Sequence, residues 1–154
     1  MKPRPSTARS VSGSRVIGAA AQPIFDILAD PAMHPVSDGS DTVREPTTGG
    51  QPRLALGSEF GMRMRIVVPY RITNRVVEFE EGRRIAWAHF GGARWRYELE
   101  PVEAGTRVTE TYDWSTATVS YYGFGIRLLG FPRRNRIGIQ RTLDRLAGLV
   151  TADR

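Results

Sequence analysis

The segment RVTETYDW, residues 107–114, places one carboxyl group among apolar side chains. Its alternation predicts a strand on which Glu110 shares a face with Val108, Tyr112 and Trp114. If that face is covered, burial disfavours the charged form of Glu110 and makes it a candidate proton donor or acceptor. The alternative is a local bulge or the opposite facing, with Glu110 in water or paired with an arginine.

His89 is the second candidate for proton transfer. In RIAWAHF, residues 84–90, it shares its face with Ile85 and Trp87. A neutral imidazole near a strand end could hydrogen-bond a ligand carbonyl, or act as a general base if a carboxylate such as Glu110 oriented it. Sequence spacing does not fix which strands are neighbours, so a half-exposed or internally satisfied histidine is the alternative.

Aromatic rings and methionines occupy the same alternating faces. The hydroxyl groups of Tyr97 and Tyr112 would suit a ligand with a few oxygen atoms. For any single member of this group, packing in the core is the competing interpretation. One curved sheet face cannot touch a single helix everywhere, so we expect these side chains to bind a ligand in a cavity: Phe60, Met62, Met64, Trp87, Trp95, Tyr97, Tyr112, Trp114, Leu143 and Leu146.

The sequence lacks the residues that disulfide bonding, metal binding and nucleophilic catalysis require. The chain has no cysteine, which excludes a disulfide frame, a thiolate metal site and a cysteine nucleophile. Its two histidines, His34 and His89, have no carboxylate at metal-ligand spacing, and no serine lies in a G-x-S-x-G turn. We therefore expect no metal and no cofactor.

The basic charge calls for a separate interpretation. The chain has 22 Lys+Arg against 16 Asp+Glu, a net charge of +6, and every basic residue except Lys2 is an arginine. These arginines are dispersed through the strands, with one local cluster, RRNR, at 133–136. A dispersed set is typical of a solvated face, so we expect no nucleic-acid partner. An interaction module that uses an arginine-rich outer face is the alternative.

Length and hydropathy point to one domain. The 154 residues have 40% hydrophobic content, and no apolar run approaches the roughly 20 residues of a membrane-spanning helix. The start, MKPRPSTARSVSGSR, has no apolar segment after its charges and is not typical of a secretory signal. We expect a flexible tail over residues 1–9, a single domain over 10–154, a cytoplasmic location, no stable membrane insertion, and a monomer or homodimer.

The order of predicted elements is helical first and then almost entirely strand. Ile24, Phe25, Ile27 and Leu28 recur at helical spacing, and the ADP that follows predicts the end of that helix. A short helical turn is expected near 31–36, and a loop with a short strand around 42–45. Alternation with short turns then predicts an antiparallel meander, with strands in 10–18, 58–68, 70–80, 84–90, 94–100 and 107–114.

A long amphipathic helix closes the chain. Ile139, Leu143, Leu146 and Val150 recur at steps of four, three and four and form one apolar stripe. This stripe predicts a helix that covers one face of the sheet. The expected class is therefore α+β, with a curved antiparallel sheet wrapped round a long C-terminal helix.

The runs AAAQPIFDILADPAMHP, VVEFEEGRRIAWA and EAGTRVTETYDW, followed by this helix, resemble the polyketide cyclase/dehydrase branch of the SRPBCC or START-like superfamily. The resemblance covers about residues 10–150 and implies the helix-grip fold, with an elongated cavity between sheet and helix. Such relatives include lipid carriers, hormone receptors and aromatic polyketide cyclases. The resemblance therefore implies a pocket and not a reaction.

Two segments bear on that resemblance. In HPVSDGSD, residues 34–41, Ser37 stands where relatives often carry a tryptophan, while His34 and Asp38 match and could simply organise the turn. Residues 115–132 are apolar, are interrupted by glycines, and lie where relatives place the cavity entrance. This segment is expected to form a gate or an interface between molecules.

The function expected from these patterns is binding of a hydrophobic small molecule, lipid-like or polyketide-like, by a carrier or sensor. The alternative is a polyketide cyclase or dehydratase that moves protons with Glu110 and His89 in the same cavity.

Overall fold

The computed structural model describes residues 9–46, 53–65, 68–89, 92–117 and 131–151. Its helices are α1 (Ala21–Leu28), a 3-10 turn η1 (Pro31–Met33), α2 (His34–Ser37) and α4 (Phe131–Thr151). Its strands are β1 (Ser10–Ile17), β2 (Val43–Pro46), β3 (Glu59–Arg65), β4 (Pro69–Glu80), β5 (Arg84–Ala88), β6 (Arg94–Val102) and β7 (Gly105–Asp113).

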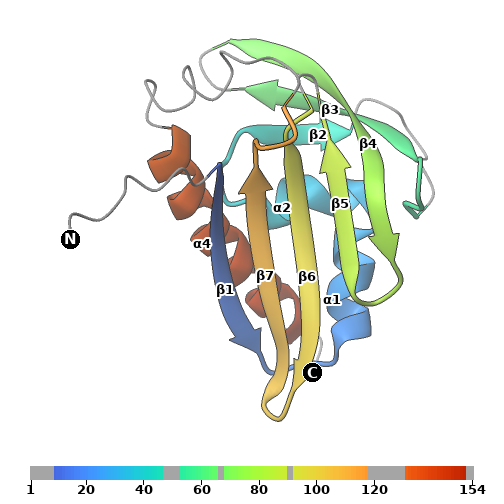
Figure 1. Cartoon of the computed structure of the whole chain (residues 1–154), viewed down its shortest axis with the longest axis vertical. Helices are drawn as coiled ribbons and strands as arrows, with labels where there is room; N and C mark the ends of the chain where they lie inside the picture. The colour runs from blue at the N-terminus through green and yellow to red at the C-terminus, as the bar shows by residue number, and fades with distance from the viewer. Residues whose placement is uncertain (1–8, 47–52, 66–67, 90–91, 118–130, 152–154) are drawn as a thin grey trace.

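The strands form one antiparallel sheet in the order β1-β7-β6-β5-β4-β3-β2. The predicted meander is therefore confirmed from β3 to β7, and β1 adds to its far edge beside β7. Figure 1 shows the sheet curling so that β2 and β3 turn back over the helices, with α4 behind β1 and β7. The predicted α+β class and the helix-grip arrangement are confirmed.

The packing of α4 on β1 depends on a small residue. A side-chain carbon at Gly13 of β1 would lie 2.8 Å from Cγ2 of Ile139, so the missing side chain lets the helix approach the strand closely. The predicted apolar stripe of α4 faces the core, and its four residues are all buried: Ile139, Leu143, Leu146 and Val150. One end of the concave sheet face is thus filled by the helix.

The loop over residues 38–42 is joined to the other side of α4. The Gly39 amide donates to Oγ1 of Thr142 at 2.9 Å. The Arg145 guanidinium donates to the Asp38 carbonyl and, at 2.8 Å, to the Asp41 carboxylate. This loop therefore has a fixed position beside the helix.

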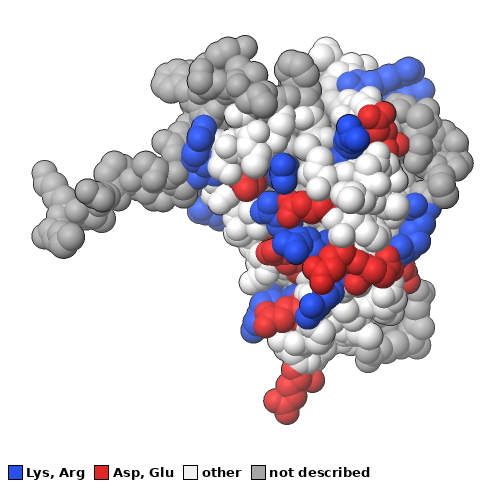
Figure 2. Space-filling view, turned by 45° about the vertical axis from the view of Figure 1, so that its right-hand side comes forward, with Lys and Arg blue, Asp and Glu red and all other residues white. Residues whose placement is uncertain are grey.

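The convex face of the sheet carries charged side chains of both signs, which form ion pairs with one another. Nη2 of Arg96 lies 2.7 Å from Oε2 of Glu78, and Nη1 of Arg94 lies 3.3 Å from the same oxygen. Partial burial of Glu78 opposes its ionisation, but the guanidinium of Arg96 and then that of Arg94 outweigh it and lower its pKa. Figure 2 shows basic and acidic side chains interleaved on this side of the molecule.

Two expectations concern residues that lie mostly outside the described ranges: the tail over residues 1–9, of which 1–8 are not described, and the segment 115–132, of which 118–130 are not described. No helix within the described ranges is long and apolar enough to cross a bilayer.

The close contact at Gly39 gives a test of the fold. A Cβ atom there would lie 2.4 Å from the Thr142 amide nitrogen and 2.5 Å from the Gly138 carbonyl oxygen, and these backbone atoms cannot rotate away. Gly39→Ala should lower the free energy of unfolding by about 1–3 kcal/mol. Gly148→Ala is the control, because nothing lies within 4 Å of its Cβ position and alanine favours a helix interior. Urea unfolding that finds the two variants equally stable would contradict the contact.

Candidate functional site

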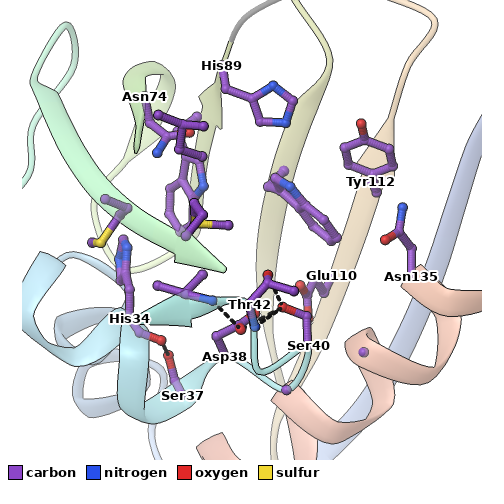
Figure 3. Close-up of a pocket in the computed structure, with 18 of the residues that line it drawn as sticks. His34, Ser37, Asp38, Ser40, Thr42, Asn74, His89, Glu110, Tyr112 and Asn135 are labelled. Carbon is purple, nitrogen blue, oxygen red and sulfur yellow. Dashed lines mark hydrogen bonds between the residues drawn. The ribbon is translucent and has the colours of Figure 1, made fainter. Parts of the chain in front are cut away.

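A cavity of about 740 Å³ lies between the concave sheet face, α2, the 38–42 loop and the first half of α4 (Figure 3). Tyr70 and Ile137 line it and are 38% and 50% exposed, so they lie at its mouth. Most of its wall is apolar or aromatic. Such a wall removes a hydrophobic ligand from water, which is the main source of affinity in pockets of this size.

Nine of the twelve side chains expected at the site line this cavity. Eight of them lie on the concave face of strands β3, β5, β6 and β7, and His89 directly follows β5. The nine residues are Phe60, Met62, Met64, Trp87, His89, Trp95, Tyr97, Glu110 and Tyr112.

The other three expected residues do not line the cavity. Leu143 and Leu146 are fully buried in the core, on the α4 stripe that packs against the β1 side of the sheet. Trp114 is 3% exposed and packs its ring 5.9 Å from that of Tyr112. The structure thus places these three in the core and not on the cavity wall. For Leu143 and Leu146 the reason is that their face of α4 packs on the β1 side of the sheet and leaves the other end of the concave face open.

Glu110 faces inward and lines the cavity, so the alternative of a bulge or a solvent position does not hold. It stands directly opposite Tyr97 in the β6–β7 ladder and is 3% exposed. The Tyr97 hydroxyl donates to Oε1 of Glu110 at 2.9 Å. Oε2 is buried and has no hydrogen-bond partner within the described part of the chain.

Burial decides the protonation of this pair. Removal from water raises the pKa of Glu110 well above 4.5, and the hydrogen bond from Tyr97 opposes this only in part. Burial and the neighbouring carboxyl group also raise the pKa of Tyr97 well above 10.0, so the phenol remains a donor. With Oε1 accepting from Tyr97, a protonated Oε2 can donate to an acceptor atom in the cavity.

Asp38 adds a carboxylate to the cavity wall. Its Oδ2 accepts from Oγ of Ser40 at 2.6 Å and from the Val43 amide at 3.4 Å. The negative charge acts on Glu110 in the same direction as burial and raises its pKa further. Asp38 thus organises the turn, as expected, and also lines the site.

His34 is the buried imidazole of the site, and the sequence reasoning did not assign it to the cavity wall. Its Nε2 lies 2.9 Å from the Leu28 carbonyl, which can only accept, so Nε2 carries the proton. Burial lowers the pKa of His34, which keeps the ring neutral. The ring stacks on Trp87 with centroids 4.7 Å apart. His89, by contrast, is half-buried, with its ring 6.4 Å from that of Tyr112.

Further polar lining residues were missed. Asn74 is 3% exposed on β4, and its alternation with Ile72 and Val76 was the available signal. Arg134 and Arg141 lie on α4 at positions that the apolar stripe does not occupy. Within the described ranges no group of three or more acidic or histidine side chains could hold a metal ion.

Comparison with known proteins supports this geometry. The polyketide cyclase/dehydrase and lipid transport family matches residues 8–151. The chain belongs to this family. It is therefore a member of the SRPBCC superfamily, and its cavity is that of a ligand-binding domain.

Sequence relatives exist in mycobacteria. The uncharacterized protein Rv0088 of Mycobacterium tuberculosis is 39% identical over 140 residues, which are 89% of this chain and 62% of the relative. The chain therefore spans less than two thirds of the length of that relative.

Solved structures share the fold at low identity. Protein NE0264 from Nitrosomonas europaea has a TM-score of 0.72 and 16% identity, over 97% of this chain and 98% of that one. The Polyketide_cyc-like protein Cgl2372 from Corynebacterium glutamicum has a TM-score of 0.61 and 19% identity, over 97% and 95%. At such identities the likeness shows the fold alone.

The raised pKa of Glu110 predicts a pH-dependent stability. Between pH 4.5, where the unfolded chain releases this proton, and the higher pKa of the folded state, the folded protein binds more protons. The free energy of unfolding should therefore fall as pH rises through this window, and Glu110→Gln should remove that fall.

Urea unfolding at several pH values checks this, with Glu98→Gln on the exposed side of β6 as the control for net charge. A difference between wild type and Glu110→Gln that stays constant with pH would contradict a buried, protonated Glu110.

Proposed function

We propose that the protein binds a hydrophobic small molecule, lipid-like or polyketide-like, in this cavity and acts as a carrier or sensor. The observation that carries the proposal is the cavity of about 740 Å³, whose wall holds a buried carboxyl oxygen with no hydrogen-bond partner among the described residues. An unpaired buried polar atom costs free energy unless a partner is supplied. A ligand with an acceptor oxygen would supply that partner.

The wall suits such a ligand in shape and chemistry. Met62 and Met64 of β3 offer flexible, polarizable side chains that adapt to irregular outlines. Trp95 packs against Tyr112 with ring centroids 4.5 Å apart and presents a flat apolar surface. Binding energy would come mainly from apolar burial, at about 25 cal/mol per Å² before ordering costs. The Tyr97–Glu110 pair would set orientation.

Filling the cavity tests the binding proposal. Ile72 lines the cavity, and Ile72→Trp should occupy part of its volume and expel the ligand. Thr73→Trp is the matched control, because the adjacent residue on β4 is exposed on the opposite face. Native mass spectrometry of protein purified without denaturant should show a bound small molecule on wild type and Thr73→Trp and little on Ile72→Trp. A folded Ile72→Trp that keeps the same molecule would contradict binding at this site.

The second candidate function is catalysis of a cyclisation or dehydration by proton transfer. The observation that favours it is Glu110, protonated by burial and held by Tyr97 on an apolar wall. Such a group can donate a proton to a carbonyl oxygen as charge develops there. His89 lines the same cavity and would be the partner base.

One substitution separates the two functions. If the protein is an enzyme, Glu110→Gln should reduce turnover of the co-purified molecule by about 100-fold or more, while its affinity changes little. Turnover followed by product mass and affinity measured by calorimetry check this. Loss of affinity without any measurable wild-type turnover would favour the carrier.

A further inference from the structure

Helix α4 carries a second stripe besides the one that packs in the core. Arg134, Gly138 and Arg141 follow one another at steps of four and three, so they lie on one face of the helix, and all three line the cavity. Asn135 lines it beside them. Arg134 and Asn135 belong to the RRNR cluster at 133–136, whose side chains do not take part in the core.

Gly138 brings the two arginines to the cavity wall. A Cβ atom at Gly138 would meet Cβ of Ser40 at 3.6 Å, so the 38–42 loop packs directly on the helix at this point. Arg134 lies one turn before this contact and Arg141 about one turn after it. Both long side chains therefore flank the place where loop and helix close one side of the cavity.

Arg141 and Asn135 are the two polar groups of this region that keep hydrogen-bonding capacity within the described part of the chain. Arg145, one turn beyond Arg141, is bound to Asp41 and to the Asp38 carbonyl. Arg141 makes no ion pair or hydrogen bond with the described residues, and neither does the Asn135 amide. Figure 3 shows the Asn135 side chain extending from α4 towards the strands.

The charges that face this stripe are few. Asp38 is the one acid besides Glu110 among the described lining residues, and Ser40 and the Val43 amide already donate to its carboxylate. Asp41 lies outside the lining; Arg145 binds it at 2.8 Å, and the charge of Arg141 also acts on it. The lining cations of this end of the cavity, Arg134 and Arg141, outnumber its lining carboxylate, Asp38.

Resting on the proposed ligand binding, we propose that the ligand is an amphipathic acid whose anionic oxygen group lies at Arg134, Asn135 and Arg141. Guanidinium groups bind carboxylate and phosphate oxygens through paired hydrogen bonds, and an asparagine amide adds a further donor. The apolar part of the ligand lies against the tryptophans and methionines. A neutral acceptor oxygen reaches the other polar point, the unpaired Oε2 of Glu110.

The test compares ligands that differ only at the head group. Displacement of the neutral dye Nile red is measured with oleate, oleyl phosphate and methyl oleate at low salt. Oleate or oleyl phosphate should bind about tenfold more tightly than methyl oleate, because charge-assisted hydrogen bonds are lost in the ester. The stronger of the two anions tells whether carboxylate or phosphate is preferred.

Two double variants assign the effect to this stripe. Arg134→Gln with Arg141→Gln should remove the preference for the anion and leave the affinity for methyl oleate within about twofold. Arg133→Gln with Arg136→Gln removes the same charge from exposed positions of α4 that do not line the cavity. This control should keep the preference, because neither side chain lines the cavity and neither can hydrogen-bond the head group of a bound ligand.

The outcomes separate this inference from the proposed function. Equal displacement by ester and acids, or an equal loss of preference in both double variants, would overturn the anion site while leaving ligand binding intact. Failure of all three probes to displace the dye from wild type, together with no molecule retained in native mass spectrometry, would overturn the binding proposal itself.

Discussion

The burial of one carboxyl group beside one phenol is the constraint on which the site depends. Glu110 and Tyr97 face each other across the β6–β7 ladder, and their hydrogen bond of 2.9 Å satisfies one carboxyl oxygen. The other oxygen has no hydrogen-bond partner in the part of the chain that the structure describes. An ionised carboxylate here would cost far more than the apolar wall around it could offset. The group therefore holds its proton, and the cavity wall offers a donor where most of the surface is apolar.

The cavity exists because α4 cannot cover the whole concave face. One stripe of the helix packs closely on β1, where Gly13 removes a side chain from the contact. The opposite side of the helix meets the 38–42 loop at Gly39, where a Cβ atom would collide with backbone atoms of Thr142 and Gly138. Between these two contacts and the curled β2–β4 edge, the side chains of the sheet face an open volume. The same helix thus closes the core and supplies polar groups to the cavity.

Alternation along the strands predicted most of this arrangement. The parity of Val108, Glu110 and Tyr112 was enough to place Glu110 inside, and it would have placed Asn74 by the same reasoning. The roles of His34 and of the arginines of α4 could not be predicted, because they depend on how a loop and a helix dock and not on strand period. Leu143 and Leu146 were assigned to the wall because spacing shows which helix face is apolar but not which part of the sheet that face covers.

The side-chain ¹³C resonance of Glu110, assigned with Glu110→Gln and followed through a pH titration, tests the central claim most directly. The account predicts a carboxyl group that remains protonated well above pH 4.5 in the folded protein and whose resonance shifts when a ligand fills the cavity. A resonance that titrates near pH 4.5 and ignores added ligand would show Glu110 in contact with water, and it would contradict the account of the site.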